Sequence, residues 1–301
     1  MQMISRRCPV CGSGDDSQVF AESTIDPSKL DAFAFASRKV PEYMHHRLVC
    51  CPTCDLLYAS PVPEREALAK AYEEAAFDSS SEARYASRTY GRFLPAIARQ
   101  LPDRHGALDI GTGDGAFLEQ LLAMKFDGVV GVEPSLAPIA AAPPAVKPLI
   151  RLGIFRPEDF QPASFSLITC FQTMEHVDDP MQLCHGAMKL LKPGGALFLI
   201  GHNRNAVSAK ILGRKSPIFD VEHVQLFSKP SARQMMERAG FTGVSVRSFV
   251  NRYPLHYWLK LLPLPARLKP GLMRFSKAIQ VGYVPLPMPA GNMAVVGYRP
   301  R

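Results

Sequence analysis

The sequence has no apolar run of the roughly 18 residues that a membrane-spanning helix requires. Its N-terminus carries Arg6 and Arg7, but no apolar segment of the kind found in secretory signals follows them. These two absences predict a cytoplasmic protein without a transmembrane segment. The chain has 301 residues, of which 47% are hydrophobic, so it is long enough for one large domain or two modest ones with a substantial core.

Acidic side chains are absent from residues 241–301, whereas nine basic ones occur there. The rest of the chain has 26 basic and 27 acidic residues, so the net charge of +8 comes from this last fifth of the sequence. Such a field attracts phosphate groups, nucleic acid or an anionic membrane surface, although a solvated basic face without a partner is about as common. We expect a basic, proline-rich cap over residues 251–301. The basic residues are Arg247, Arg252, Lys260, Arg267, Lys269, Arg274, Lys277, Arg299 and Arg301.

Tryptophan occurs once, at Trp258, within a pattern that follows Pro254. Leu255, Leu259 and Leu262 share one helical face with this tryptophan. Apolar anchors with basic flanks fit a helix that lies on an anionic membrane surface. They fit equally a lid over a phosphorylated lipid or glycan. An amphipathic helix packed on the protein core is the commoner outcome, and we favour it here.

Cysteine is concentrated at the N-terminus, where residues 1–78 hold five of the seven. Cys8 and Cys11 form one Cys-x-x-Cys pair, and Cys51 and Cys54 form a second. Four thiolates with this spacing, in a sequence without a secretion signal, predict a closed tetrahedral zinc site. A site with four cysteine ligands has no open position, so the zinc would be structural and would stabilise a segment with little core of its own. Reduced structural thiols or a redox pair are the alternatives.

Three more potential ligands lie beside the second pair. Cys50 directly precedes it and could exchange with one of its members as a ligand. His45 and His46 lie a few residues upstream, and we expect both at the surface. The predicted ligand set therefore remains the four paired cysteines.

A glycine-rich turn is the most specific motif of the central region. It reads Asp109-Ile-Gly111-Thr-Gly113-Asp-Gly115, and Glu133 follows at the end of the next short apolar run. Glycine at alternate positions lets the backbone approach a ligand closely, and an acidic residue about 20 positions further on can hold a ribose diol. A tight structural turn or a dinucleotide site are the alternatives, but the spacing differs from Gly-x-Gly-x-x-Gly. The motif predicts a site for a nucleoside-containing cofactor.

Short apolar runs alternate with helical patterns between residues 79 and 204, which is typical of strand–helix–strand units and a parallel sheet. Apolar residues from Tyr90 to Leu101 recur at three- and four-residue spacing and predict a helix before the glycine turn. Pro143 and Pro144 are expected to end a short helix near Ser135. The fold class is therefore α/β. Expected strands cover residues 107–110, 129–132, 149–152, 165–170, 196–200, 244–249 and 293–298, and further helices cover 116–124, 181–191 and 231–239.

Residues 79–250 resemble the class I S-adenosylmethionine-dependent methyltransferases, because several motifs of that family occur in order. The glycine turn and Glu133 match its cofactor loop and its ribose-binding acid. Asp159, in Glu-Asp-Phe, stands where such proteins place a residue against the adenine amine. Residues 165–176 resemble the strand and loop that flank the methyl donor, and residues 191–195 the turn before strand five. The resemblance implies a Rossmann-like sheet of seven strands that binds S-adenosylmethionine through Asp109, Gly111, Gly113, Gly115, Glu133 and Asp159.

Together with the cysteine pairs, residues 220–228 resemble a narrower group, the bacterial methyltransferases with an N-terminal zinc-binding segment. Its best-known members methylate carbon atoms of nucleotide-linked deoxysugars. The stretch contains Glu222-His223 followed by Phe227-Ser228, much like the group's Glu-His-x-x-x-Phe-Ser. The resemblance implies that His223 is the acid/base and that Glu222 orients it. The sugar enzymes carry a further large C-terminal domain, and because only residues 241–301 follow Gly240 here, we expect no counterpart of that domain.

The sequence predicts transfer of a methyl group to carbon or oxygen of a small-molecule, glycan or lipid-linked acceptor, which the basic cap suggests is anionic and phosphorylated. His176 and His202 follow two of the predicted strands, at the end where parallel strands form a crevice, and could contact the acceptor. His176 is the third catalytic candidate, with His223 and Glu222. A ribosomal RNA methyltransferase is an alternative that the basic residues suit, although no aromatic and basic interleaving accompanies the cysteine segment. A non-catalytic, zinc-stabilised binding protein is a second alternative.

Overall fold

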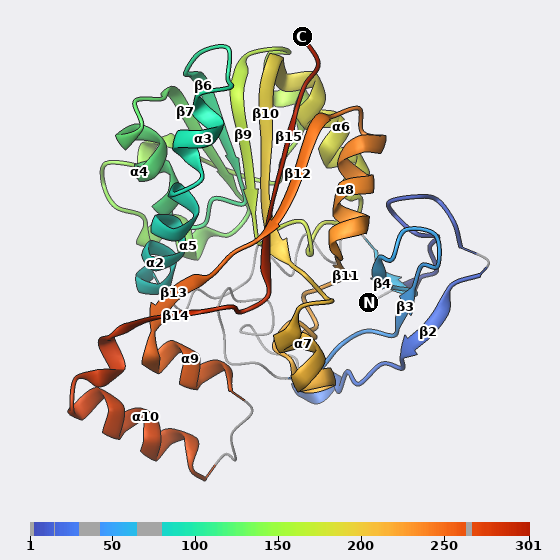
Figure 1. The fold of residues 1–301 in the computed structure, drawn as a ribbon, viewed down its shortest axis with the longest axis vertical. Helices are drawn as coiled ribbons and strands as arrows, with labels where there is room; N and C mark the ends of the chain where they lie inside the picture. The colour runs from blue at the N-terminus through green and yellow to red at the C-terminus, as the bar shows by residue number, and fades with distance from the viewer. Residues whose placement is uncertain (1–2, 15, 30–42, 65–79, 263–266) are drawn as a thin grey trace.

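A computed structural model places a seven-stranded sheet at the centre of the molecule, with helices on both faces (Figure 1). The structure describes residues 3–14, 16–29, 43–64, 80–262 and 267–301. The strands of this sheet are β6 (His105–Ile110), β7 (Asp127–Glu133), β8 (Ile150–Leu152), β9 (Phe165–Phe171), β10 (Leu191–His202), β12 (Thr242–Ser248) and β15 (Asn292–Tyr298).

The strand order is β12-β15-β10-β9-β6-β7-β8. Neighbouring strands from β10 to β8 pair in parallel, whereas β15 is antiparallel to both β10 and β12. The carboxyl ends of β6, β7, β9 and β10 therefore meet at one edge, where open α/β sheets bind ligands. The predicted α/β fold with a seven-stranded sheet is confirmed.

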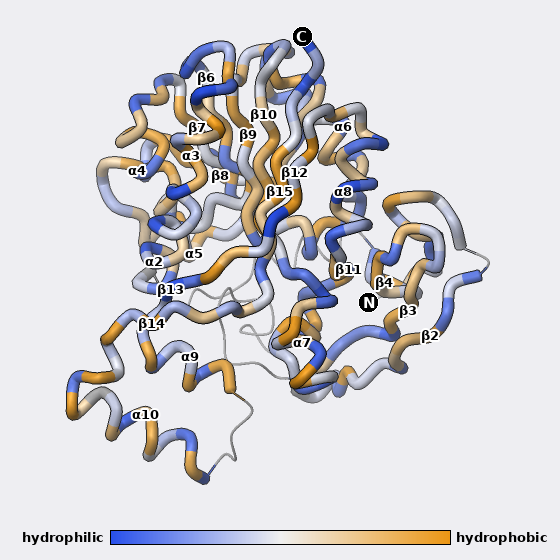
Figure 2. The backbone as a smooth tube through the Cα atoms, in the orientation of Figure 1, coloured by the Kyte–Doolittle hydropathy of each residue, from blue (hydrophilic) through white to orange (hydrophobic). Residues whose placement is uncertain are grey.

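Two apolar cores lie on the two faces of the sheet, because successive side chains of a strand point to opposite sides. On β10, Leu197 and Leu199 belong to the core beneath α6 and α8, whereas Phe198 and Ile200 belong to the core beneath α2, α3 and α4. Figure 2 shows the hydrophobic colour concentrated along β9 and β10. The helices are α2 (Ser80–Gly91), α3 (Leu94–Ala98), α4 (Ala116–Ala123), α5 (Leu136–Ala141), α6 (Pro180–Leu190) and α8 (Lys229–Arg238).

The predicted helix from Tyr90 to Leu101 is wrong in one respect, because the structure divides this stretch between α2 and α3. Pro95 explains the break, since a proline has no backbone N–H and its ring clashes with the carbonyl of the residue four positions earlier. That residue is Gly91, where α2 ends. Tyr90, Leu94 and Ile97 nevertheless enter the same core, as their spacing predicts.

The N-terminal segment forms a small antiparallel sheet that is joined to the main domain. It contains β2 (Gln18–Ala21), β3 (Leu48–Cys50) and β4 (Leu57–Ala59), and its fourth strand, β11 (Gln225–Leu226), comes from the second half of the chain. A two-residue strand, β1 (Met3–Ile4), pairs with β5 (Val62–Pro63). Val49, Leu56 and Tyr58 share a core with α6 and α8, so the segment is not self-contained. The predicted domain boundary at residue 78 lies outside the described residues.

The C-terminal segment packs at the end of the molecule opposite the C-terminus (Figure 1). Its hairpin lies beside α2, and α9 packs on α10. No helix in the described parts of the chain is long and apolar enough to cross a membrane. The elements at this end are α7 (Val207–Leu212), η4 (Gly213–Lys215), β13 (Asn251–Pro254), α9 (Leu255–Leu261), α10 (Lys269–Ala278), η5 (Val281–Tyr283) and β14 (Pro285–Met288).

Candidate active site and cysteine cluster

A cavity of about 1540 Å³ lies at the carboxyl ends of the parallel strands. Its lining includes the glycine turn after β6, Glu133 at the end of β7, the loop after β9 and His202 at the end of β10. A single small-molecule site usually occupies about 300–1,000 Å³. The cavity therefore has room for a cofactor and a second molecule together.

The glycine turn adopts the backbone conformation that its sequence predicts. Gly111, Gly113 and Gly115 have φ angles of 72°, 58° and 75°, a left-handed region that side chains other than glycine rarely occupy. A Cβ atom at Gly111 would lie 2.3 Å from Thr173 Oγ1, whereas one at Gly113 would meet nothing within 4 Å. The backbone at Gly113 thus lies against open space in the cavity, where a bound molecule can approach it.

Glu133 is fixed in the cavity wall by two backbone donors. The amide of Gly113 donates to its Oε2 at 2.8 Å, and the amide of Ser135 donates to its Oε1 at 3.0 Å. Burial raises the pKa of this carboxyl above its usual value, although both hydrogen bonds act in the opposite direction. The predicted ribose-binding acid therefore lies directly beside the glycine turn.

Asp109 is buried near the end of β6 and contacts Thr112 of the glycine turn. The hydroxyls of Thr169 and Thr112 donate to its two carboxyl oxygens at 2.6 and 2.8 Å. Burial raises its pKa to about 6, against the effect of these hydrogen bonds. Asp159 lies differently, because its side chain is exposed at the cavity rim, at the end of η3 (Pro157–Asp159). Five of the six predicted cofactor residues line one cavity, and the sixth, Gly115, directly precedes α4 beside it.

His176, Glu222 and His223 form a cluster in the other half of the cavity. His176 Nδ1 lies 3.8 Å from Glu222 Oε2, and the rings of His176 and His223 are 4.9 Å apart. One nitrogen from each histidine and one carboxylate oxygen lie within 4.8 Å of one another, a set that can exchange protons or bind a divalent metal. The three predicted catalytic residues, which come from distant parts of the sequence, are therefore brought together.

The tautomer of His223 follows from its backbone contact. Its Nδ1 lies 2.8 Å from the carbonyl oxygen of Ile218, which can only accept, so Nδ1 carries the proton. In the neutral ring the lone pair is then on Nε2, which makes this nitrogen the basic one. His202 lies 5.3 Å away, centroid to centroid, and is held by Asn292 at 3.1 Å. Burial lowers the pKa of His202 to about 3, so this ring stays neutral near pH 7.

Sequence reasoning missed three residues that hold this cluster in place. Glu175 is buried and accepts from the backbone amide of His202 at 2.6 Å; burial raises its pKa to about 7. Gln225 donates to the carbonyls of Met174 and Val177, both at 2.6 Å. Arg6 reaches the same loops from the N-terminal segment. Glu175 adjoins a predicted site residue, but no signal in the sequence indicates the contacts of Gln225 or Arg6.

Apolar and aromatic side chains line the wall of the cavity next to the C-terminal segment. The C-terminal segment supplies Tyr253, Tyr257 and Trp258, and β9 supplies Phe171. Trp258 is buried, and its indole N–H donates to the carbonyl of Leu286 at 3.1 Å. The favoured interpretation of α9 as a helix packed on the core is thus confirmed, and the helix also lines the cavity. None of the basic side chains that the structure describes in residues 241–301 lines it.

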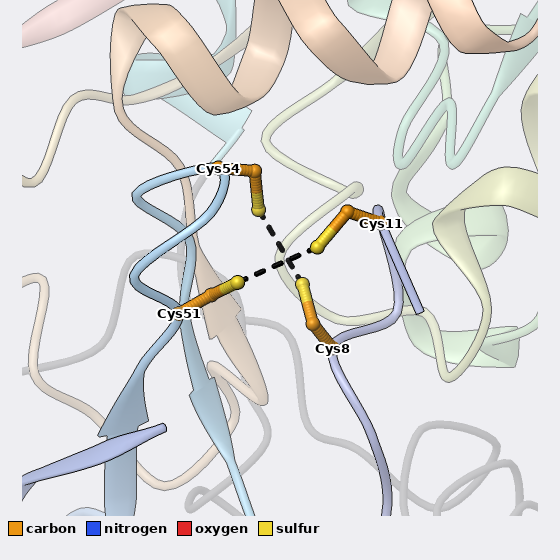
Figure 3. A group of neighbouring side chains, drawn as sticks. All are labelled: Cys8, Cys11, Cys51 and Cys54. Atoms are coloured by element: carbon orange, nitrogen blue, oxygen red, sulfur yellow. Dashed lines mark hydrogen bonds between the residues drawn. The ribbon is translucent and has the colours of Figure 1, made fainter. Parts of the chain in front are cut away.

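The four paired cysteines converge on one point, as Figure 3 shows. The Sγ atoms of Cys8 and Cys54, and those of Cys11 and Cys51, are 3.4 Å apart. A zinc ion with Zn–S distances of about 2.3 Å would hold tetrahedral ligands about 3.8 Å apart, so the sulfurs need only small shifts. The hydrogen bond with Cys54 lowers the pKa of Cys8 well below that of a free thiol. The donor set fits a closed zinc site.

The two cysteine turns have the same backbone design. The amide of Gly12 donates to the carbonyl of Cys8 at 2.9 Å, and the amide of Asp55 donates to that of Cys51 at 3.0 Å. Gly12 and Asp55 both have positive φ angles. Cys50 lies outside this cluster, in contact with Arg204 at 3.2 Å.

The expectation that His45 and His46 lie at the surface is wrong, because both are buried. His45 Nδ1 lies 2.8 Å from the carbonyl oxygen of His46, and His46 Nε2 lies 3.0 Å from that of Val221. Burial lowers the pKa of His46 to about 4. His46 therefore joins the N-terminal segment to the main domain, and the ring of His45 adds an edge-on contact with Phe219 at 6.2 Å between centroids. Neither ring belongs to the cysteine cluster.

Comparison with known proteins gives partial matches of moderate identity. The chain is 31% identical over 166 residues to a ubiquinone biosynthesis O-methyltransferase of Idiomarina loihiensis, a match that covers 48% of this chain and 64% of the relative. A ubiquinone biosynthesis O-methyltransferase of Pseudomonas aeruginosa is 32% identical over 104 residues, covering 33% of this chain and 44% of the relative. The chain thus spans less than two thirds of the length of these relatives.

Among solved structures, a Thermotoga maritima S-adenosylmethionine-dependent methyltransferase, described as a possible histamine N-methyltransferase, matches with a TM-score of 0.47 and 20% identity. The match covers 73% of this chain and 94% of the other. The family model described as "Methyltransferase domain" matches residues 82–246, more than half of the sequence. The chain belongs to this family, and residues 82–246 form a class I S-adenosylmethionine-dependent methyltransferase domain.

Proposed function

We propose that this protein transfers the methyl group of S-adenosylmethionine to a hydroxyl oxygen of an apolar, ring-bearing small molecule. The observation that carries this proposal is the cluster of His176, Glu222 and His223 on the wall of a cavity that also contains the glycine turn and Glu133. A basic imidazole opposite a cofactor site is what proton removal during methyl transfer requires.

Asp109, Gly111, Gly113, Gly115, Glu133 and Asp159 would hold the cofactor. The open space at Gly113 and the inward position of the buried Glu133 fit a ribose and an amino-acid group close to the backbone. Asp159, at the rim, would contact the adenine amine. When bound, S-adenosylmethionine supplies an electrophilic methyl group on a positively charged sulfur.

His223 is the proposed general base, with its lone pair on Nε2. Nε2 takes the proton of the acceptor hydroxyl, and an oxygen lone pair forms the new O–CH₃ bond. The methyl–sulfur bond breaks and its electrons remain on sulfur, so S-adenosylhomocysteine and the protonated imidazole are formed. Glu222, 3.8 Å from His176, supplies negative charge beside the imidazoles and stabilises the proton that one of them receives.

An apolar ring-bearing acceptor is supported by the aromatic residues Phe171, Tyr253, Tyr257 and Trp258 around the cavity. The relatives named as ubiquinone biosynthesis O-methyltransferases favour oxygen as the acceptor atom. The phosphorylated acceptor expected from the basic residues has less support, because the described cap brings none of its basic side chains to the lining. The resemblance to sugar C-methyltransferases through Glu222 and His223 keeps a nucleotide-linked sugar as the acceptor to compare.

We further propose that Cys8, Cys11, Cys51 and Cys54 hold a structural zinc ion. The convergence of the four sulfurs and the matching turns support this proposal. The cluster lies apart from the lining of the cavity, so the zinc would stabilise the fold without contacting the acceptor.

His223→Asn tests the proposed base. We expect kcat to fall about 10²–10⁴-fold with nearly unchanged affinity for S-adenosylmethionine, because the proton acceptor is lost while the cofactor half is intact. Turnover is followed with methyl-labelled cofactor and affinity by calorimetry. His185→Asn, an exposed histidine on α6 outside the cavity lining, is the matched control. Glu133→Ala should lose cofactor binding. Wild-type turnover by His223→Asn would contradict the role of His223.

The acceptor is identified by offering the wild-type protein hydroxylated aromatic compounds with apolar tails, nucleotide-linked ketosugars and ribosomal RNA. Label on the oxygen of the aromatic compounds supports the proposal. Label on a sugar carbon or on RNA would replace it with the corresponding alternative. Cofactor binding without label on any acceptor would favour a non-catalytic binding protein.

A further inference from the structure

Helix α10 presents an apolar stripe to solvent. Leu268, Leu272, Phe275 and Ile279 recur at intervals of three and four residues, so they lie along one face. Each of these side chains is between 42% and 65% exposed. Helix α10 packs on α9 and η5, and the exposed fractions show that the stripe faces solvent rather than this contact. A large exposed apolar surface with regular spacing marks an interaction site.

Helix α7 repeats this pattern with a different segment of the chain. Val207 and Ile211, four positions apart, are 73% and 78% exposed. In Figure 1, α7, α9 and α10 lie at the same end of the molecule, opposite the C-terminus, and Figure 2 shows hydrophobic and hydrophilic positions mixed along α7 and α10. We call the surface formed by residues 207–215, 255–262 and 267–288 the cap end, which includes α7, η4, α9, α10, η5 and β14.

All charged residues in the sequence of the cap end are lysine or arginine. Residues 207–215 and 255–288 contain eight basic residues and no acidic one. Arg214, Arg267 and Arg274 are exposed. Apolar stripes flanked by cations are the chemistry that binds the interface of an anionic bilayer, where the apolar groups enter the headgroup region and the cations meet lipid phosphates. The eight residues are Lys210, Arg214, Lys215, Lys260, Arg267, Lys269, Arg274 and Lys277.

We propose that the cap end docks on the surface of an anionic membrane. A bilayer surface is the one partner that accepts both stripes and their flanking cations at once, because it offers apolar depth and negative charge over a wide area. The sequence alone suggested α9 and Trp258 as the membrane element, but Trp258 is buried and α10 carries the exposed stripe.

The cap end also contributes to the wall of the cavity, which bears on how the proposed apolar acceptor reaches the site. Leu262 and Met288 line the cavity and are also about two fifths exposed, and Leu212 of α7 lines it as well. These residues place part of the cavity wall beside the cap end. We infer that an acceptor dissolved in the bilayer enters the cavity from this side.

Vesicle flotation of the full chain tests the docking without substrate, so its outcome does not depend on the reaction. We expect the protein to float with vesicles of equal parts phosphatidylglycerol and phosphatidylcholine, to be released by high salt, and not to float with phosphatidylcholine alone. Leu272→Glu combined with Phe275→Glu should weaken binding at least about tenfold. Arg267→Glu combined with Arg274→Glu should do the same. Leu122→Glu on α4, with the same 42% exposure as Leu272, is the matched control and should bind normally.

Three results would overturn the proposal. Folded wild-type protein could fail to float with anionic vesicles, or the stripe variant could bind as tightly as wild type. The stripe could instead join two copies of the chain, in which case sedimentation would show a dimer that Leu272→Glu with Phe275→Glu converts to monomers. Circular dichroism of each variant establishes that it is folded, and normal turnover of a water-soluble acceptor would separate failure of docking from failure of the proposed reaction.

Discussion

At the scale of single residues, the wall of the cavity around the glycine turn depends on a backbone conformation that suits glycine and on buried carboxyl groups. Gly113 adopts a left-handed backbone conformation beside open space, and its backbone amide donates a hydrogen bond to Glu133. Asp109 is buried behind the turn, where ionisation costs free energy. Such costs are typical of sites that are arranged for a ligand rather than for maximal stability.

The raised pKa of Asp109 predicts how the free energy of unfolding depends on pH. Its pKa is raised from 3.8 to about 6 in the folded state, so the native protein retains this proton after the unfolded chain has lost it. The contribution of Asp109 to the free energy of unfolding is thus greatest at low pH and decreases as pH rises from about 4 to 6. The decrease amounts to about 3 kcal/mol.

Asp109→Asn has no proton to lose, so the difference in unfolding free energy between wild type and variant should change by this amount across the window. Urea unfolding without cofactor at pH 4, 5, 6 and 7 measures it. Asp159→Asn, at an exposed position, is the control and should follow the wild-type curve. A constant difference between wild type and Asp109→Asn over the whole range would contradict the prediction.

At the scale of elements, the sequence predicts the main sheet well because its signals are local. Short apolar runs give the strands, and the positive φ angles of the glycine turn follow from residue type. Pro95 was a local signal too, but the apolar spacing around it suggested one helix where there are two. The elements that the sequence could not place are those defined by distant contacts: β11 as a strand of the N-terminal sheet, and α9 as a wall of the cavity.

The prediction at the scale of elements concerns the metal site of the two cysteine turns. Cys54→Ser should lose the metal, because three thiolates leave a tetrahedral site incomplete, and should lower the thermal midpoint by at least about 5 °C. Elemental analysis should find one zinc per wild-type chain. Cys50→Ser is the matched control, since Cys50 adjoins the pair but lies outside the cluster, and it should retain the zinc. A metal-free wild-type protein of normal stability would contradict the zinc site and favour reduced thiols.

At the scale of the whole molecule, Arg6 connects the N-terminal segment with the loops that carry His176 and His223. Its guanidinium donates to the carbonyls of Asp178 and Val224 at 2.8 and 2.6 Å, to Gln225 Oε1 at 3.0 Å, and to the carbonyl of Ala59 at 3.0 Å. These contacts join positions up to 219 residues apart, which explains why no local pattern indicates them. Because Val224 follows His223, the N-terminal segment helps to position the proposed base.

Arg6→Ala should therefore affect stability and turnover together. The variant leaves several acceptors without their donor, and we expect a loss of about 3–5 kcal/mol in the free energy of unfolding and a clear fall in kcat, with the zinc retained. Burial lowers the pKa of Arg6 to about 10, so the side chain is still charged at pH 7 and these are charge-assisted hydrogen bonds. Arg7→Ala, at the exposed neighbouring position, should change the unfolding free energy by less than about 1 kcal/mol. If both variants unfolded at the same denaturant concentration, the expected role of Arg6 in stabilising these loops would be contradicted.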